Sequence, residues 1–397
     1  MSLISSQSKS KSRPRAFRGR LAPLAAGLTL LLPGAALAAP YTPSSDAQVL
    51  AELPAGARHA GLPNRELTRT RLDIAVPLAQ FYISRARATG DLRYLGYADA
   101  ILAPWLQRST PLTQVLVLHA TILQSRHAFG AALTELDAAL QLRADDPQAW
   151  LTRATVLRVL GRYAQALESC QHLQASADPA IVTLCMQSVL SLTGHLSTAY
   201  AAVVALPQQT LPPEVRAWRY SELGEMAERL GNDTAAEHWF REGLQVAADD
   251  FYMRAACADL LLRHGRAAET LRLLAGYESM EPMLLRMTIA HRLLQDGSGA
   301  QSQALLASAF EVEEQRGDAV HRREQARYFL DVDPEPVAAL RAAQKNWQAQ
   351  REPDDILLLL RAAQAAHEPS EAEPAAQFLR QQGLEDARLL LAAGRSP

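Results

Sequence analysis

Cysteine, lysine and aromatic residues are scarce in this sequence. Three cysteines and three lysines occur among 397 residues, and aromatic residues make up 6%. Val and Ile are also rare beside Ala and Leu. Ala and Leu lose little conformational entropy on entering a helix, whereas β-branched and aromatic residues lose more. The composition therefore predicts an all-α protein.

Motifs of the common catalytic and metal sites are missing as well. No two of the ten histidines lie three or four residues apart, and HExxH, GxSxG, a phosphate loop and GxGxxG do not occur. We therefore expect a protein that is not an enzyme and has no cofactor or metal. The alternative is an enzyme in which Glu225, Glu228 and Asp259 face one another across a pocket. Otherwise these three acids are expected to be solvent-facing helix charges.

The first 38 residues have the pattern of a secretory signal. Residues 1–20 carry six cations and no acid, and the apolar run LAPLAAGLTLLLPGAALA ends in Ala36-Leu37-Ala38. A basic start, a short apolar stretch and small residues before the cut are what cleavage requires. A retained membrane anchor is the alternative, but the run is short and interrupted by proline and glycine. We expect cleavage and an exported, periplasmic or secreted protein.

Removal of this segment makes the chain acidic. It leaves 34 basic residues against 42 acidic ones, a formal charge of about −8. Nucleic-acid binding needs a basic face. The sequence therefore predicts no nucleic-acid partner and, after cleavage, no insertion into a membrane.

The chain repeats itself at an offset of 34 residues. Residues 113–146 align with 147–180, and further copies occur at 217–250 and from 251 onward. The offset places Leu116 on Trp150, Ala120 on Ala154, Leu123 on Leu157, Phe129 on Tyr163, Ala132 on Ala166 and Leu133 on Leu167. A fixed period of this length indicates a tandem array of helical hairpins.

The copies resemble tetratricopeptide repeats (TPRs), here of an exported bacterial type. The resemblance is carried best by Trp150, Ala154, Leu157, Tyr163 and Ala166, and it is in good register over about 113–274. It implies an all-α, right-handed α-solenoid of stacked antiparallel helix pairs. One hairpin cannot bury its apolar face alone, so neighbouring hairpins must stack.

Packing explains why particular residue types recur. Small residues are needed where two antiparallel helices approach closely, and Ala154, Ala166, Gly224 and Ala236 are predicted to meet that need. Trp150, Leu157 and Tyr163 are predicted to fill the space between pairs. Glycine at the end of a first helix closes the turn in a left-handed conformation. This is the role expected of Gly161, Gly194, Gly231 and Gly265.

The flanks predict further helices of the same kind. The expected organisation is a signal peptide (1–38), a linker (39–67), a degenerate N-terminal repeat (68–112), tandem TPR-like repeats (113–282), and divergent C-terminal repeats with a cap (283–397). In the last part, helices are expected around 304–330, 335–350, 354–367 and 372–382.

The cysteines allow two interpretations. Cys170 falls late in a second helix and Cys185 early in the next first helix, and these helices lie side by side in a solenoid. A disulfide is therefore conceivable in an exported protein. Alternatively all three cysteines are buried small hydrophobic residues, as we expect for Cys257.

The resemblance implies a binding groove lined by the first helices. The corresponding positions are Gln114, Thr121, Gln124, Thr155, Arg158, Trp218, Glu225, Glu228, Arg229, Tyr252, Asp259 and Arg263. Trp218 and Tyr252 occupy equivalent positions, so we expect two aromatic rings on one wall, where they would anchor a peptide. The alternative is that both rings pack between helices and the charges form a solvated face.

One family feature is absent. Members that bind chaperone tails hold a peptide carboxylate with Lys and Asn, but Lys345 is the sole lysine after residue 38 and lies outside the regular repeats. Chaperone tails are therefore not implied.

These patterns predict a non-catalytic protein–protein interaction scaffold of the cell envelope in a Gram-negative cell. Its partner would be another protein, an envelope component bound in the groove. The alternative is a module that binds a small ligand or a polysaccharide.

Overall fold

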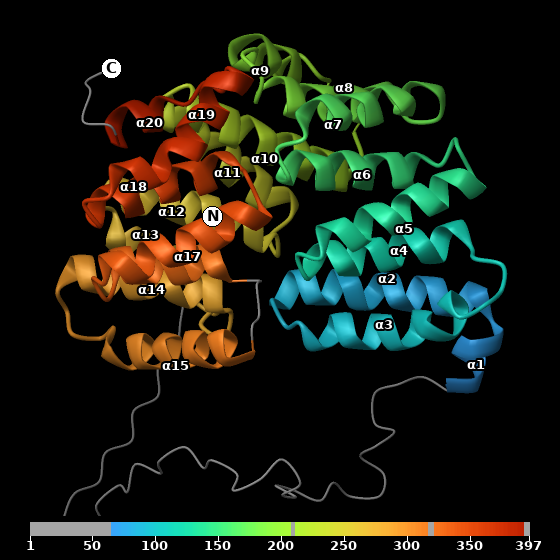
Figure 1. The fold of residues 1–397 in the computed structure, drawn as a ribbon, viewed down its shortest axis with the longest axis horizontal. Helices are drawn as coiled ribbons and strands as arrows, with labels where there is room; N and C mark the ends of the chain where they lie inside the picture. The colour runs from blue at the N-terminus through green and yellow to red at the C-terminus, as the bar shows by residue number, and fades with distance from the viewer. Residues whose placement is uncertain (1–64, 208–210, 317–320, 393–397) are drawn as a thin grey trace, which may run out of the picture. The chain divides into compact units, whose positions relative to one another are not determined.

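The computed structural model describes residues 65–207, 211–316 and 321–392 (Figure 1). The predicted signal peptide, residues 1–38, lies outside this range, as does the expected linker up to residue 64. The described chain is helical and begins with α1 (Arg65–Thr70), inside the segment expected to be linker. The next helices are α2 (Leu72–Thr89), α3 (Arg93–Leu106), α4 (Thr113–Ser125), α5 (Phe129–Leu142), α6 (Pro147–Val159), α7 (Tyr163–His172), the 3₁₀ helix η1 (Leu173–Ala175), α8 (Pro179–Leu190) and α9 (Leu196–Val204).

The second half continues in the same way. It contains α10 (Pro213–Arg229), α11 (Asp233–Val246), α12 (Phe251–Arg263), α13 (Ala267–Leu274), α14 (Glu281–Leu294), α15 (Ala300–Arg316), α16 (Arg322–Asp331), α17 (Pro336–Ala349), α18 (Pro353–Ala365), the 3₁₀ helix η3 (Pro369–Ala372), α19 (Glu373–Gln382) and α20 (Ala387–Ala392). The helix expected at 304–330 is two helices, α15 and α16. The all-α class and the TPR-like solenoid are confirmed.

Local signals in the sequence set the ends of these helices. Asp146 and Asp250 precede α6 and α12, and each carboxylate accepts a hydrogen bond from a backbone N–H in the first turn. Gly161 and Gly231 follow the ends of α6 and α10 with φ of 71° and 75°. A left-handed residue is favourable there only as glycine, which has no Cβ to clash.

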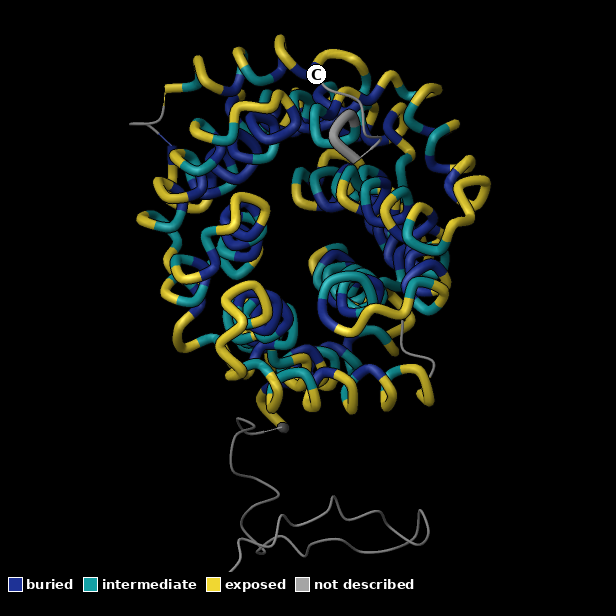
Figure 2. The backbone as a smooth tube through the Cα atoms, turned by 90° about the vertical axis from the view of Figure 1, so that its left-hand side faces the viewer, coloured by how far each residue is buried: buried dark blue, intermediate teal, exposed yellow. Residues whose placement is uncertain are grey.

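Consecutive helices pack as antiparallel pairs, and the first helices of neighbouring pairs contact one another in two runs. One run joins α4, α6, α8 and α10, and the other joins α12, α14 and α16. The first helices of these runs form the inner layer of a solenoid. In Figure 2 buried and exposed stretches alternate along the helices, as expected where one face of each helix packs.

The repeat positions pack as the sequence predicts. Ala154, Ala166 and Ala236 are at most 2% exposed. Gly224 packs directly on the ring of Phe240, so that a Cβ there would lie 2.2 Å from Phe240 Cε1. Tyr163 is buried. Trp150 is half-buried; its ring stacks on His172 with centroids 4.1 Å apart, and its Nε1 donates to the Ala144 carbonyl.

The sequence led us to expect that the C-terminal helices cap the last repeat. In the structure their contacts extend further. These helices pack back on repeats in the middle of the chain, where α20 contacts α10. The backbone N–H of Arg351 donates to the Val159 carbonyl, and the Phe378 and Tyr163 rings lie 5.7 Å apart. The core around α4–α8 therefore includes residues from 326 to 384.

The first repeat also meets a later one. Helix α2 contacts α12, and a Cβ on Gly90 would lie 2.8 Å from Met280 Cε. Two ends of the repeat array that are far apart in sequence are thus held together.

Candidate functional site

The inner layer of first helices is the surface on which the sequence placed a binding groove. The residues predicted for that groove fall into two groups. Gln114, Thr121, Gln124, Thr155, Trp218 and Tyr252 remain wholly or partly accessible to solvent. Arg158, Glu225, Glu228, Arg229, Asp259 and Arg263 lie in or beside ion pairs and hydrogen bonds within the chain.

The accessible residues do not form a continuous apolar surface. The Thr121 and Thr155 hydroxyls donate to carbonyls four residues earlier, so both side chains lie flat on their helices. Trp218 Nε1 donates to Glu222 Oε1 at 3.0 Å. Tyr252 is 43% exposed, a large fraction for an aromatic residue on an inner helix. Among the described side chains there is no ring contact between Trp218 and Tyr252.

A small cavity lies beside Trp218. Thr155 and Arg158 of α6, Ser188 of α8, and Trp218 and Glu222 of α10 line it, and it holds about 60 Å³. That is room for a few water molecules and too little for a sugar ring.

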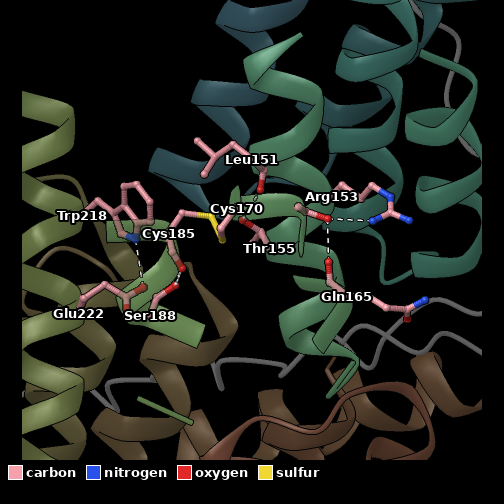
Figure 3. Close-up of a disulfide and its surroundings, with 10 residues drawn as sticks. Leu151, Arg153, Thr155, Gln165, Cys170, Cys185, Ser188, Trp218 and Glu222 are labelled. Atoms are coloured by element: carbon pink, nitrogen blue, oxygen red, sulfur yellow. Dashed lines mark hydrogen bonds between the residues drawn. A yellow bond between two sulfur atoms is a disulfide. The ribbon is translucent and has the colours of Figure 1, made fainter. Parts of the chain in front are cut away.

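A disulfide forms one side of this cavity (Figure 3). Cys170 of α7 and Cys185 of α8 are bonded, with Cα atoms 5.5 Å apart. The first of the two interpretations of these cysteines is therefore correct. Cys257 is free and buried, as expected for a core residue.

An inner charge network joins α6 to the C-terminal helices; we use this name for Arg158, Glu225, Arg323, Glu352 and Asp355. Arg158 lies 3.6 Å from Glu352, and Arg323 lies 2.9 Å from Glu352 and 2.7 Å from Asp355. Burial opposes ionisation of Glu352, but Arg323 and Arg158 outweigh it and lower its pKa. Burial raises the pKa of Asp355 to about 6. Because the side chain of Asp355 is fully buried, Arg323 is its essential counter-charge.

Glu225 has the most perturbed environment of the predicted groove acids. Burial and the neighbouring Glu222 carboxylate raise its pKa to about 8, against the opposing influence of Arg158. The charge of Glu225 in turn raises the pKa of Tyr252. A proton on Glu225 is therefore retained at neutral pH, and the network carries less negative charge than its composition suggests.

The acids predicted to be solvent-facing helix charges are not. Glu228 is 5% exposed and is bound by Arg263 and, at 3.6 Å, by Arg388 of α20. Asp259 is half-buried and pairs with Arg286 at 2.5 Å and Arg327 at 2.8 Å. The expectation is wrong because it assumed an inner surface open along its whole length, whereas helices α16 and α20 bring arginines to it.

Arg229 is buried too. Its guanidinium donates to the Ser191 carbonyl at 2.6 Å and to the Ser191 hydroxyl at 2.8 Å, which ties α10 to the end of α8. It also borders a cleft of about 650 Å³ between α9–α10 and the C-terminal helices. Leu196, Leu230 and Leu384 give this cleft an apolar lining, with Asp386 among the polar groups.

Sequence reasoning missed the residues that complete this surface. Glu222 could have been predicted to contact Trp218, since it lies four residues later on the same face of the helix. No signal in the sequence identifies Arg323, Glu352 and Arg388. Some of the partners of these residues lie more than 150 positions away in the chain. The described side chains that could hold a metal ion, Glu281, Glu313 and His321, lie at the junction of α14, α15 and α16.

Comparisons with known proteins concern the fold. No family model and no curated protein sequence matches the chain. Among solved structures it is similar to a human IFIT1 dimer with PPP-AAAA, at 14% identity over 73% of this chain and 69% of that one, with a TM-score of 0.44. The fold is TPR-like, because its helices are paired and follow a 34-residue period.

Two other solved structures are similar at lower scores. Pseudomonas aeruginosa PilF matches at 17% identity over 64% of this chain and 98% of its own, with a TM-score of 0.31. The TPR domain of P58(IPK) matches at 16% identity over 68% of this chain and 84% of its own, with a TM-score of 0.25. These similarities concern the fold and do not identify a binding partner. No helix in the described ranges is both long and apolar enough to cross a bilayer.

Proposed function

We propose that this chain is a non-catalytic scaffold of the cell envelope that binds a segment of another protein on the inner layer of its first helices. The observation that carries the proposal is the accessibility of Tyr252 and Trp218 beside the inner charge network. An exposed tyrosine and a half-buried tryptophan are the residue types that anchor partners at interfaces. Core packing alone gives no reason to leave Tyr252 43% exposed.

The charges around these rings favour a particular kind of contact. Arg158 is already paired with Glu352, and Glu222 already accepts from Trp218. A partner would therefore gain affinity from apolar and aromatic contacts at Tyr252 and Trp218, with the paired charges fixing orientation and specificity. We expect the partner to present a short extended or helical segment, since both modes place a few side chains on anchors of this kind.

Two features support an exported protein. The basic and apolar pattern of residues 1–38 is that of a cleaved signal, and a disulfide between Cys170 and Cys185 persists in oxidising compartments. Two of the three acids named for a catalytic pocket, Glu228 and Asp259, support the absence of catalysis. Glu228 and Asp259 are both engaged by arginines, which leaves neither free to act as a general base.

A photo-crosslinking experiment tests the proposal. A photoreactive phenylalanine analogue in place of Tyr252 is expected to give a discrete adduct with an envelope protein in cells. The matched control replaces Tyr97 of α3, which is exposed to nearly the same extent, 42%, but lies away from the inner layer. If neither position gives an adduct, or if both positions give the same adducts, the inner layer of first helices is not the binding surface.

A double variant then tests the anchors. Trp218→Ala with Tyr252→Ala is expected to lose the partner while keeping its helical circular dichroism spectrum. Retained binding by the folded double variant would move the interaction elsewhere on the array.

A module for a small ligand or polysaccharide is the second candidate, and one observation favours it. The cleft of about 650 Å³ between α9–α10 and the C-terminal helices lies within the usual size of a ligand pocket, roughly 300–1,000 Å³. Leu384→Trp would fill this cleft. Loss of glycan binding in that variant, with the Tyr252 adduct unchanged, would support the second function.

A further inference from the structure

Three metal-ligating side chains meet at the junction of α14, α15 and α16. Glu281 is the first residue of α14, Glu313 lies in α15, and His321 immediately precedes α16. One ligand atom from each lies within 4.8 Å of the other two. The cluster is separate from the inner charge network, so a role for it does not depend on the proposed partner surface.

The hydrogen bonds of this cluster are incomplete. His321 Nδ1 lies 2.6 Å from Glu313 Oε1 and 3.2 Å from Glu281 Oε1, so one nitrogen faces two carboxylates. Its single proton bonds to Glu313. Glu281 Oε1 is shut off from solvent and has no hydrogen-bond partner. A buried carboxylate oxygen without a partner costs free energy and calls for an explanation.

The charges around the cluster are also out of balance. Three carboxylates, Glu281, Glu313 and Glu324, surround His321. Two arginines, Arg286 and Arg323, act on Glu324, and each is already paired with an aspartate, Asp259 and Asp355 respectively.

We propose that Glu281, Glu313 and His321 form a zinc-binding site that ties together α14, α15 and α16. Two carboxylate oxygens and one imidazole nitrogen, with water as the fourth ligand, satisfy tetrahedral zinc. Ligand atoms around such an ion lie roughly 3.4 Å apart. The distance of 3.2 Å from His321 to Glu281 already fits, and the distance of 2.6 Å to Glu313 needs to lengthen by less than about 1 Å.

The ligand types decide between metals. An imidazole nitrogen suits zinc and other late transition ions, whereas magnesium and calcium prefer oxygen ligands alone and more of them. Binding would replace the proton on His321 by the ion and would give Glu281 Oε1 its missing partner. The ion would also fix the start of α16, the helix that supplies Arg323 and Arg327 to the inner layer.

Calorimetric titration of the purified, tag-free chain with zinc tests the site. We expect one zinc ion per chain and a rise in Tm on binding. Glu313→Gln and His321→Asn are each expected to weaken zinc binding at least tenfold and to abolish the rise in Tm. The matched control is His264→Asn, because His264 Nε2 also faces a carboxylate, Asp233, at 2.8 Å, but has no third ligand beside it. That control is expected to bind zinc like the wild type.

Three outcomes would overturn the proposal. They are no zinc binding at micromolar concentrations, equal binding by wild type and both site variants, and equal binding of magnesium or calcium in place of zinc. Circular dichroism checks that each variant is folded. Glu313→Gln is nearly isosteric and keeps the test valid if His321→Asn fails to fold.

Discussion

The contacts between neighbouring repeats and the contacts between the C-terminal helices and the repeats are built differently. Neighbouring repeats meet through small and apolar residues, such as Gly243 of α11 against Met253 of α12. The C-terminal helices meet the repeats through apolar residues and also through the inner charge network. A repeated interface can be made by a repeated pattern of residue size. An interface that occurs once, between segments far apart in the chain, has no such pattern to follow. Paired charges and hydrogen bonds can specify it, because they match in only one register.

The largest expected effect comes from breaking the charged interface. Arg323→Met leaves Glu352 and the fully buried Asp355 without their shared guanidinium. Removing one partner of a buried ion pair typically costs roughly 3–5 kcal/mol. We expect a loss of that size in the free energy of unfolding, measured by urea titration. The control is Arg361→Met, which removes an exposed partner of Asp331 and should cost less than about 1 kcal/mol.

The next effect concerns the covalent link between two repeats. Cys170 and Cys185 close a loop with a sequence separation of 15 residues, and such a crosslink stabilises a protein by about 3 kcal/mol in the chain-entropy model. Cys170→Ser with Cys185→Ser should lower the free energy of unfolding by about that amount. Cys257→Ser is the control for removing a buried thiol. A double variant no less stable than that control would show that the disulfide adds nothing.

Breaking the size pattern between the two helices of one repeat should have a somewhat smaller effect. In Gly224→Ala the new Cβ would meet the Phe240 ring at 2.2 Å, and overpacking of this kind costs about 1–3 kcal/mol. Gly130→Ala is matched to it, because Gly130 is also helical but has nothing within 4 Å of the new atom. That control should be neutral or slightly stabilising, since alanine loses less entropy in a helix. Comparison of the Tm of the two variants separates the cost of overpacking from the change in helix propensity.

The last effect is a pH dependence at Glu225, which is the smallest of the four when it is measured over a single pH unit. The pKa of Glu225 is raised to about 8, so between about pH 4.5 and pH 8 the folded state holds a proton that the unfolded state releases. Its contribution to stability therefore falls as pH rises through this window. Relative to the wild type, Glu225→Gln should gain about 1 kcal/mol in free energy of unfolding per pH unit between pH 6 and 7. Glu242→Gln, at an exposed position, should show no such trend.

The difference between the two kinds of contact also explains what the sequence could reveal. The 34-residue period predicts helix pairs, their turns and the small residues between them, because these contacts are local and recur. Gly161 and Gly231 end first helices as expected, and Ala154 and Ala236 are buried. Each of these features follows from residues fewer than 40 positions apart.

The candidate site could be predicted only in part. The pattern identified which helices form the inner layer and that Tyr252 lies on it. It could not predict that Arg158 pairs with Glu352 or that Glu228 faces Arg388, because no period relates these residues. The single helix expected at 304–330 is two helices, α15 and α16. The sequence does carry a signal for this division, the Gly317-Asp318 pair, because glycine favours the end of a helix.

The return of the C-terminal helices to mid-chain repeats has a consequence for synthesis. Tyr163 binds the Arg351 carbonyl 188 residues later, and the Leu196 N–H binds Glu385 189 residues later. At roughly 5–20 residues per second, the ribosome needs about 10–40 seconds to produce these partners. During that interval the early repeats have emerged with the apolar surface around Tyr163 uncovered. A nascent chain of this design depends on a holding factor, or on rapid transfer to where it folds, before its last fifty residues are made.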